Sequence, residues 1–216
     1  MINDVARTQP IQVFFMPELY MSRYSKARFL KSAASPDAFG DDSGAEVAFA
    51  GRSNSGKSSA LNAIVRRRDL ARTSRTPGRT QFVNLFELEP GRRLADLPGY
   101  GHANVPVAVR AAWGRLIETY FMERESLAGL FIIADSRRGF GDSDLVMLEY
   151  AAARGLPAHV LLSKCDKLTR NEARQTLQTA QRALGTRADV QLFSAQSGEG
   201  VEKAQGAMDA LLARKR

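Results

Sequence analysis

From residue 47 onward, short apolar runs alternate with longer amphipathic segments. Apolar runs of this length are typical of buried strands, and the amphipathic segments are typical of helices. Such alternation predicts an α/β fold of three layers, a mostly parallel sheet with helices on both faces. One antiparallel hairpin strand is expected, because Pro90 and Gly91 mark a turn between two of the runs. We expect strands at 47–51, 82–88, 92–96, 130–135, 158–163 and 190–194, and helices from residue 57 and at 107–123, 143–154, 171–184 and 201–213.

The chain has 216 residues, which suits one domain of this class and is short for two average domains. The segment 35–44 is rich in Ser, Asp and Gly and is interpreted as a linker. We therefore predict a basic N-terminal arm and linker at 1–44, at least partly packed on the domain. The domain itself is placed at 45–213 and a basic C-terminal tail at 214–216.

The sequence indicates a cytoplasmic protein. Its one cysteine, Cys165, excludes an internal disulfide, in agreement with a reducing compartment. No apolar stretch approaches the roughly 18 residues of a membrane-spanning helix. The N-terminus lacks a basic start followed by an apolar run, so no secretory signal is expected. We expect no membrane insertion.

Basic residues outnumber acidic ones, giving a formal net charge of +8 and an isoelectric point of about 10.0. A polyanion that met clustered arginines would release counterions. Two interpretations stay open, a nucleic-acid contact surface and a basic face that is only solvated. The clusters are Arg66–Arg68, Arg72, Arg75, Arg79, Arg92–Arg93, Arg137–Arg138 and Arg214–Arg216.

The segment from Gly51 to Ser58 matches the pattern G-x-x-x-x-G-K-[ST] at every fixed position. It follows a predicted strand and opens a predicted helix, so backbone N–H groups and the helix N-terminus can face nucleotide phosphates. Lys57 is expected to contact the β- and γ-phosphates, and the Ser58 hydroxyl to reach Mg²⁺. The predicted contacts in this loop are Gly51, Arg52, Ser53, Asn54, Ser55, Gly56, Lys57, Ser58 and Ser59.

The motif Asp96-Leu97-Pro98-Gly99 ends the strand after the hairpin. There the carboxylate can hold Mg²⁺ through water, and the Gly99 N–H can contact the γ-phosphate. Between the two motifs lies a polar segment, 76–81, that offers a second hydroxyl ligand. We choose Thr80 over Thr76, because Thr80 lies immediately before the next strand. The predicted metal ligands are Ser58, Thr80 and Asp96, and the further nucleotide contacts are Gly78, Arg79, Thr80, Gln81, Phe82, Asp96, Leu97, Pro98 and Gly99.

Two further strand ends are predicted to bind the base. The Asp166 carboxylate can accept hydrogen bonds from N1–H and the 2-amino group of guanine, and adenine offers neither donor. The Lys164 stem can cover the ring face, and the Ala195 N–H can meet guanine O6. Their order after the phosphate loop predicts a site for GTP or GDP. The predicted base contacts are Ser163, Lys164, Cys165, Asp166, Phe193, Ser194 and Ala195.

Together these motifs resemble those of the bacterial ribosome-biogenesis GTP-binding proteins of the EngB type, within the TrmE/Era branch of P-loop GTPases. The resemblance covers about residues 20–212 and is carried by 51–59, 76–81, 96–101, Trp113-Gly114 and the Ser-Lys-x-Asp form of the base motif. Ser163 stands where Asn is commoner, and threonine is familiar there in the family. The resemblance implies a Ras-like P-loop GTPase domain. It also implies that the large ribosomal subunit or its precursor is the partner, with an indirect requirement in cell division and septation.

Hydrolysis is expected to be slow. Tyr100 follows Gly99, where Ras-like proteins use a glutamine to orient the attacking water, and a phenol does not suit that task. A partner, or K⁺ held by Asn54 as in relatives with asparagine there, is expected to complete the site. The predicted catalytic residues are Lys57, Thr80 and Asn54, acting in a monomer. His159 is interpreted as a core residue, His102 as a weak catalytic candidate and Cys165 as a small filler.

Two other functions stay open at this point. One is an ATP-using P-loop phosphotransferase or ATPase, in which Asp166 would be incidental. The other is a nucleotide-binding septum or membrane adaptor, which would need an amphipathic surface helix. Competition of unlabelled GTP against ATP would distinguish the first from a GTPase.

Overall fold

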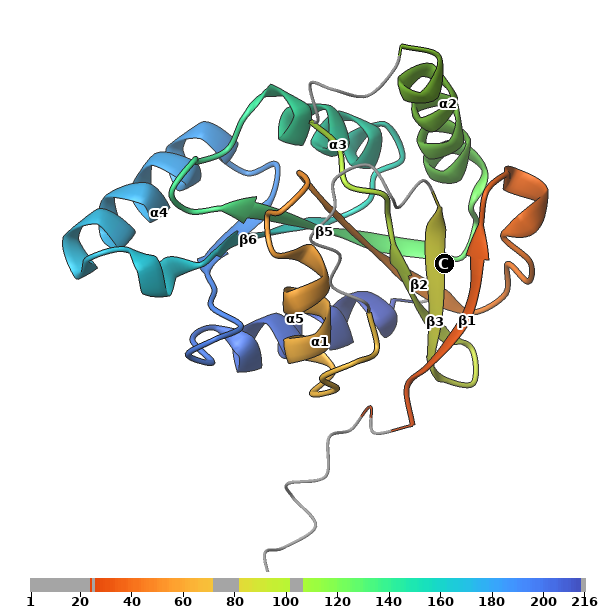
Figure 1. Ribbon diagram of the computed structural model, residues 1–216, viewed down its shortest axis with the longest axis horizontal. Coiled ribbons are helices and arrows are strands. Elements are labelled where there is room, and N and C mark those ends of the chain that lie inside the picture. Colours follow the sequence, from red (N-terminus) through yellow and green to blue (C-terminus); the bar gives the residue numbers. More distant parts are fainter. Residues whose placement is uncertain (1–23, 25, 72–81, 102–106, 215–216) are drawn as a thin grey trace, which may run out of the picture.

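The computed structural model describes residues 24, 26–71, 82–101 and 107–214 (Figure 1). The strands are β1 (Arg28–Ala33), β2 (Ala45–Gly51), β3 (Val83–Glu89), β4 (Arg92–Asp96), β5 (Leu127–Asp135), β6 (Ala158–Ser163) and β7 (Asp189–Leu192). The α-helices are α1 (Lys57–Ile64), α2 (Val107–Glu123), α3 (Asp142–Ala153), α4 (Arg170–Leu184) and α5 (Val201–Leu212). Two short 3-10 helices, η2 (Pro36–Ala38) and η3 (Cys165–Lys167), complete the described elements.

The seven strands form one sheet in the order β1-β3-β4-β2-β5-β6-β7. Strand β3 is antiparallel to both of its neighbours, and the pairs on the other side of β4 are parallel. Gly91, in the turn between β3 and β4, has a φ of 77°, which glycine adopts without a Cβ clash. The structure therefore confirms the predicted fold class, a mostly parallel sheet with one antiparallel hairpin strand.

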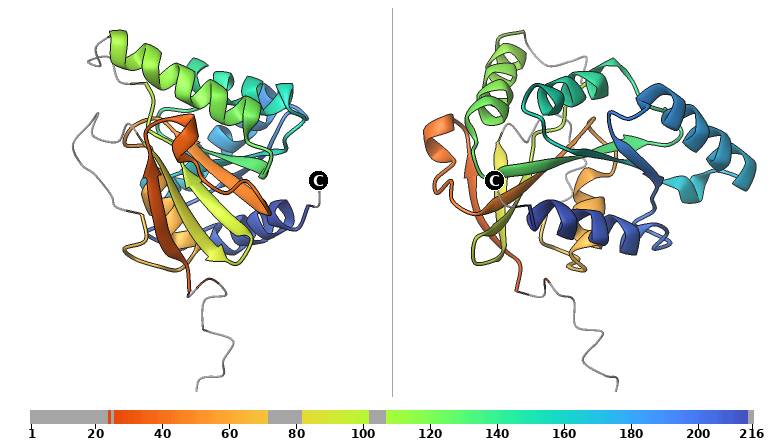
Figure 2. Two further views of the ribbon diagram at one scale, coloured as in Figure 1. Left: turned by 90° about the vertical axis from the view of Figure 1, so that its right-hand side faces the viewer. Right: turned by 180° about the vertical axis from the view of Figure 1, so that it is seen from behind.

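Helices cover both faces of the sheet (Figures 1 and 2). Helices α1 and α5 pack on one face, through side chains such as Leu61 and Met208. Helices α2, α3 and α4 pack on the other, through Phe121, Leu148 and Leu184. Every residue of the central strands β2 and β5 is buried as a result. In sheets of this kind, ligands bind beyond the carboxyl ends of the strands.

The predicted elements agree closely with the structure. Strands β4 and β6 and helix α2 have the predicted bounds. Strand β5 begins at Leu127, earlier than expected, because Gly129 continues the strand under α5. A Cβ at Gly129 would lie 2.7 Å from a methyl group of Leu211, so a larger residue here would force the Leu211 side chain to move. Among the residues that the structure describes, no helix combines the length and the apolar character needed to cross a membrane.

Strand β1 was not predicted from the sequence. This strand pairs with β3 at the edge of the sheet, although it precedes the segment interpreted as a linker. That segment is anchored to the domain: Phe39 packs against Tyr120, and the Asp42 carboxylate accepts hydrogen bonds of 2.9 Å from two backbone N–H groups at 125 and 126. The boundary placed at residue 45 stays a prediction, and β1 lies before it in the same sheet.

A buried acidic residue, Glu46, lies near the start of β2. Its side chain is fully buried and accepts hydrogen bonds from Tyr120 Oη at 2.7 Å and Arg124 Nη2 at 2.9 Å. Arg93 Nε lies 3.3 Å from the same carboxylate. A buried carboxylate needs such partners, because an unpaired charge in the core would cost several kcal/mol (about 3–5 when one partner is removed). This cluster fastens α2 and β4 to the end of the sheet opposite the motifs.

Candidate nucleotide-binding site

The phosphate-binding loop connects the end of β2 to α1. Its turn requires glycine at two positions. Gly56 has a φ of 94°, and a Cβ at Gly51 would lie 2.7 Å from the backbone oxygen of Ile133. Asn54 also has a positive φ, 64°. The loop therefore curls back over the N-terminus of α1, an arrangement that suits phosphate oxygens.

Lys57, the first residue of α1, forms a direct ion pair with Asp96 at the end of β4. The two side chains are 10% and 6% exposed. Strand β4 is the neighbour of β2, so their carboxyl ends place the lysine and the carboxylate together. The pair joins the residue predicted to contact the phosphates to the one predicted to hold Mg²⁺.

The segment after β4 lies directly against the phosphate-binding loop. Leu97 N donates to Phe49 O at 2.9 Å, and Ser53 N donates to Tyr100 O at 2.9 Å. A Cβ at Gly99 would lie 2.8 Å from Ser53 Oγ, so a larger residue at this position would displace the Ser53 side chain. Pro98 is buried between them. The predicted γ-phosphate contact, Gly99 N–H, thus belongs to a segment that packs on the loop.

The base motif after β6 is joined to the same loop. The Ser163 hydroxyl donates to the backbone oxygen of Ser55, and Lys164 Nζ donates to the backbone oxygen of Asn54 at 2.6 Å. Serine at 163 therefore supplies a link between the base motif and the loop. Lys164 has a φ of 59°, and its stem passes over Gly56, where a Cβ would lie 3.7 Å from Lys164 Cε.

Asp135, at the end of β5, organises the cations around this motif. Its Oδ2 is 2.9 Å from Lys164 Nζ and 2.7 Å from Arg137 Nη2. Burial alone would raise the pKa of Asp135, but the hydrogen bonds from Arg137 and Lys164 outweigh burial and hold that pKa well below its ordinary range. Asp135 is therefore ionised at neutral pH and provides the counter-charge for Lys164.

Asp166 and Ser194 meet across the ends of β6 and β7. Ser194 Oγ donates to Asp166 Oδ1 at 2.6 Å, and Lys167 Nζ lies 3.0 Å from Oδ2. The hydrogen bond from Ser194, and the smaller effect of Lys167, hold the pKa of Asp166 below its ordinary value. Cys165 N donates to Phe193 O at 3.3 Å, which brings the two predicted base segments together. Ala195 is exposed beside them.

The remaining predicted residues divide into two groups. Ser58 and Ser59 lie in the first turn of α1, and Phe82 precedes β3 with 41% of its surface exposed. Gly78, Arg79, Thr80 and Gln81 lie outside the described residues, as do Thr76 and His102. The individual nucleotide and metal contacts stay predictions, because they concern atoms of bound ligands.

The structure places two of the other singled-out residues in the core. His159 on β6 is 6% exposed and bonds Gln191 at 2.9 Å, so it is a core residue, as expected. Cys165 is buried, and burial raises the pKa of its thiol to about 12. The thiol therefore stays protonated and unreactive at neutral pH.

Two residues of this region were missed by the sequence analysis. Asp135 was treated as the end of a strand, although the strand-end argument that selected Asp96 applies to it equally. Asp144 on α3 carried no signal beyond that of an acidic residue in a first helical turn. The structure shows it fully buried, with Tyr100 and Arg52 as partners.

The fold and these strand ends define a P-loop nucleotide-binding domain with guanine-type base motifs. Comparison with known proteins gives the family. Residues 46–164 match the family described as "50S ribosome-binding GTPase". The chain is 50% identical over 185 residues to a probable GTP-binding protein EngB of Xanthomonas campestris pv. campestris, covering 84% of this chain and 89% of that one. It is also 50% identical to the probable EngB of Stenotrophomonas maltophilia, covering 84% and 92%.

The chain therefore belongs to the EngB family of GTP-binding proteins and is a GTPase. A crystal structure of a probable GTP-binding protein engB matches with a TM-score of 0.64 and 19% identity, over 79% of this chain and all of that one, which shows the shared fold. The family decides between the two enzymatic interpretations of the sequence in favour of GTP over an ATP-using phosphotransferase.

Proposed function

We propose that this GTPase is a GTP-controlled switch that assists assembly of the large ribosomal subunit in the cytoplasm. Through that role it would support normal cell division and septation. The observation that carries the proposal is the family match, whose description is a GTPase that binds the 50S ribosome. The net charge of +8 suits a partner rich in RNA phosphate. We propose that the protein acts as a monomer that binds the subunit or its precursor.

The basic clusters differ in how far they are available to RNA. Arg93 is 7% exposed and pairs with Glu46, so it is a structural residue of the interior. It belongs neither to a nucleic-acid contact surface nor to a solvated basic face. Arg92 pairs with Glu89. Three arginines not singled out in the sequence, at positions 170, 174 and 182, are exposed on α4. Among the described residues they have no ion-pair partner within 4.0 Å.

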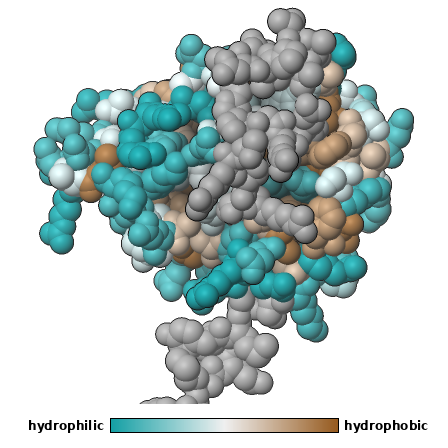
Figure 3. All heavy atoms as spheres, in the orientation of Figure 1, coloured by the Kyte–Doolittle hydropathy of each residue, from teal (hydrophilic) through white to brown (hydrophobic). Residues whose placement is uncertain are grey.

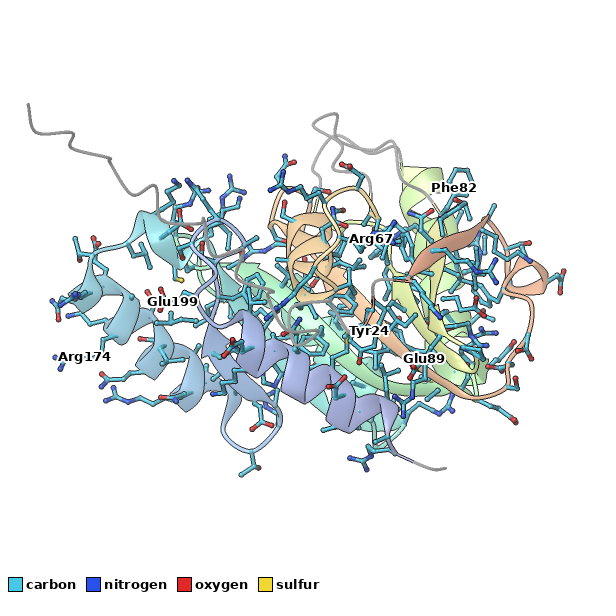
Figure 4. All side chains as sticks on the ribbon, turned by 90° about the horizontal axis from the view of Figure 1, so that it is seen from below. Tyr24, Arg67, Phe82, Glu89, Arg174 and Glu199 are labelled. Carbon is cyan, nitrogen blue, oxygen red and sulfur yellow. The ribbon has the colours of Figure 1, made fainter. Side chains whose placement is uncertain are left out.

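Helix α4 therefore presents a basic surface. Hydrophilic residues cover the end of the molecule where α4 lies (Figure 3). Arg174 lies at the outer edge, pointing away from the body of the domain (Figure 4). We propose that this α4 surface, defined by Arg170, Arg174 and Arg182, contacts rRNA phosphates.

Magnesium is proposed as the resident metal. The residues fit: Ser58 provides a hydroxyl at the start of α1, and Asp96 provides a buried carboxylate, and Mg²⁺ prefers such oxygen ligands. Thr80 would supply a further hydroxyl. When bound, Mg²⁺ would neutralise charge on the β- and γ-phosphates. Lys57 is already beside Asp96 and would contribute a second positive charge there.

Slow hydrolysis and activation by a partner or by K⁺ also belong to this proposal. The Tyr100 hydroxyl donates to Asp144 at 2.9 Å and is 5% exposed, so it is not free to orient an attacking water. Asn54 is exposed in the loop, where its side-chain oxygen could hold K⁺. Equal hydrolysis rates in potassium and sodium salts would exclude the cation.

Co-sedimentation with large ribosomal subunits tests the central proposal. The protein is mixed with purified subunits in GDP, in GTP and in a non-hydrolysable GTP analogue, and the bound fraction is measured. We expect the analogue to give the largest bound fraction, because the γ-phosphate orders the segments that contact it. Equal binding in GDP and in the analogue would contradict a GTP-controlled switch and leave the GTPase assignment intact.

A further inference from the structure

One buried carboxylate joins three segments around the predicted γ-phosphate position. Asp144, in the first turn of α3, is fully buried. Its Oδ1 accepts from Tyr100 Oη at 2.9 Å, and its Oδ2 accepts from the backbone N–H of Gly141 at 2.9 Å. Arg52 Nε lies 3.3 Å from Oδ2, and another guanidinium nitrogen of Arg52 donates to the backbone oxygen of Gly139.

The partners of Asp144 come from the two segments that are predicted to hold phosphate. Arg52 is the second residue of the phosphate-binding loop, and Tyr100 directly follows Gly99. Their backbones also pair with each other as a parallel bridge. The Tyr100 ring packs on Trp113 of α2, with ring centroids 6.1 Å apart. Gly99 thus lies between a close contact with Ser53 and the Tyr100 side chain, which is fixed by Asp144.

We propose that Asp144 is a positioning residue for GTP. It holds Tyr100 and Arg52 so that the Gly99 N–H stays aligned with the γ-phosphate. The carboxylate acts through these two residues and does not touch the nucleotide. The proposal rests on the predicted contact between Gly99 and the γ-phosphate, and it is independent of the ribosomal partner.

This role predicts an effect that depends on the γ-phosphate. GDP lacks the group that Gly99 is expected to contact, so its binding does not depend on the position of Gly99. GTP binding and hydrolysis do depend on it. Loss of a general structural support would instead weaken GDP and GTP binding alike, because both use the phosphate-binding loop.

The chain contains a matched control cluster at the other end of β2. There the Tyr120 hydroxyl donates to the buried carboxylate of Glu46 at 2.7 Å, and Arg124 pairs with that carboxylate. The chemistry is the same, a phenol, a buried carboxylate and an arginine. The two clusters lie about 20 Å apart, because Glu46 and Arg52 are separated by six residues of extended chain.

The experiment compares Tyr100→Phe with Tyr120→Phe. Each change removes one hydroxyl and keeps the ring. Fluorescence titration gives the Kd for GDP and for a non-hydrolysable GTP analogue, and steady-state hydrolysis gives kcat and KM. Thermal melting of both variants shows that they are folded.

For Tyr100→Phe we expect the Kd for the analogue to rise about tenfold, a size typical of losing a hydrogen bond to a charged group. We expect kcat to fall as well, and the Kd for GDP to change less than about twofold. Tyr120→Phe should lower the melting temperature and leave the ratio of the two Kd values as it is in the parent. Equal losses for GDP and the analogue in Tyr100→Phe, or no loss in either, would overturn the proposal.

A second variant, Asp144→Asn, keeps the size of the side chain and removes the charge that pairs with Arg52. In the double variant with Tyr100→Phe, the effects on analogue affinity should be less than additive, because both changes break the same link. Additive effects would show that Tyr100 and Asp144 act separately. If Asp144→Asn does not fold, the comparison of the two tyrosine variants still decides the proposal.

Discussion

Lys164 Nζ lies 2.9 Å from the Oδ2 atom of Asp135, which places a strand-end carboxylate of β5 beside the lysine of the base motif. The same ammonium donates to the backbone oxygen of Asn54. Asp135 therefore fixes the lysine whose stem is predicted to cover the guanine ring. The Lys164 side chain in turn links the base motif to the phosphate-binding loop.

The variant Asp135→Asn should weaken the binding of GDP and of a GTP analogue to the same degree, by about five- to tenfold. The amide keeps the size of the side chain but loses the charge that holds Lys164, and a partly buried ion pair of this kind contributes on the order of 1 kcal/mol. Isothermal titration calorimetry measures both affinities. Glu149→Gln, an exposed change on α3, serves as the control. A loss confined to the analogue would mean that Asp135 acts on the γ-phosphate instead.

Lys57 and Asp96 give a prediction that separates binding from stability. Lys57→Met should abolish measurable nucleotide binding, since it removes the charge aimed at the phosphates. It should also lower the melting temperature, because Asp96 is buried and loses its partner. The double variant Lys57→Met/Asp96→Asn should recover much of the melting temperature while nucleotide binding stays absent. Unchanged GTP affinity in Lys57→Met would contradict the phosphate-loop assignment.

His159 predicts a pH dependence of stability. Burial holds the pKa of His159 below its ordinary value of 6.5, against the hydrogen bond that its ring donates to Gln191 Oε1 and the charge of Asp189, with Lys203 acting in the same direction as burial. Between that lowered pKa and 6.5, the unfolded chain binds more protons than the folded one. The free energy of unfolding should therefore fall as the pH falls below about 6.5.

The contribution of this one group is at most about 1.4 kcal/mol per pH unit. Urea unfolding of the parent and of His159→Gln, measured across pH 5 to 8 (an interval of about three units that brackets the ordinary histidine pKa), isolates it. The difference in free energy of unfolding between the two proteins should shrink as the pH falls through the window. A constant difference would mean that His159 has the same pKa in both states.

The motifs and their common edge could be predicted from the sequence because each follows an apolar run, and the carboxyl ends of parallel strands meet at one edge. Strand β1 could not, because four of its six residues are exposed and the pattern therefore lacks the apolar run of a buried strand. Whether a charged side chain points into the core or into solvent could not be predicted from the sequence either. Arg93 and Asp144 are both buried, and their partners are distant in sequence. Glu46 compensates the charge of Arg93, and the Tyr100 hydroxyl donates a hydrogen bond to Asp144.

The α4 surface gives the last prediction, which concerns RNA. Arg170, Arg174 and Arg182 are exposed on α4, whose N-terminal end follows the base motif. Glu172, the acidic residue of the first turn, is bonded to Thr169 at the helix N-cap. Glu172 is therefore bonded to the helix N-cap, and among the described residues it forms no ion pair with these arginines. Each arginine that engages an rRNA phosphate releases counterion when it binds.

Binding to large ribosomal subunits should therefore weaken steeply as salt rises, with a log–log slope of about −0.7 to −0.9 for each phosphate contact. Replacing Arg170 and Arg174 together by Gln should weaken binding at low salt and reduce the magnitude of that slope by about 1.4 to 1.8, the value for two contacts. Arg92→Gln is the control, because Arg92 is already paired with Glu89 in the β3–β4 hairpin. Co-sedimentation in the GTP analogue across a series of KCl concentrations measures the slopes. If the α4 variant keeps the slope of the parent, the arginines of α4 are only solvated, and the RNA contact lies on another part of the surface.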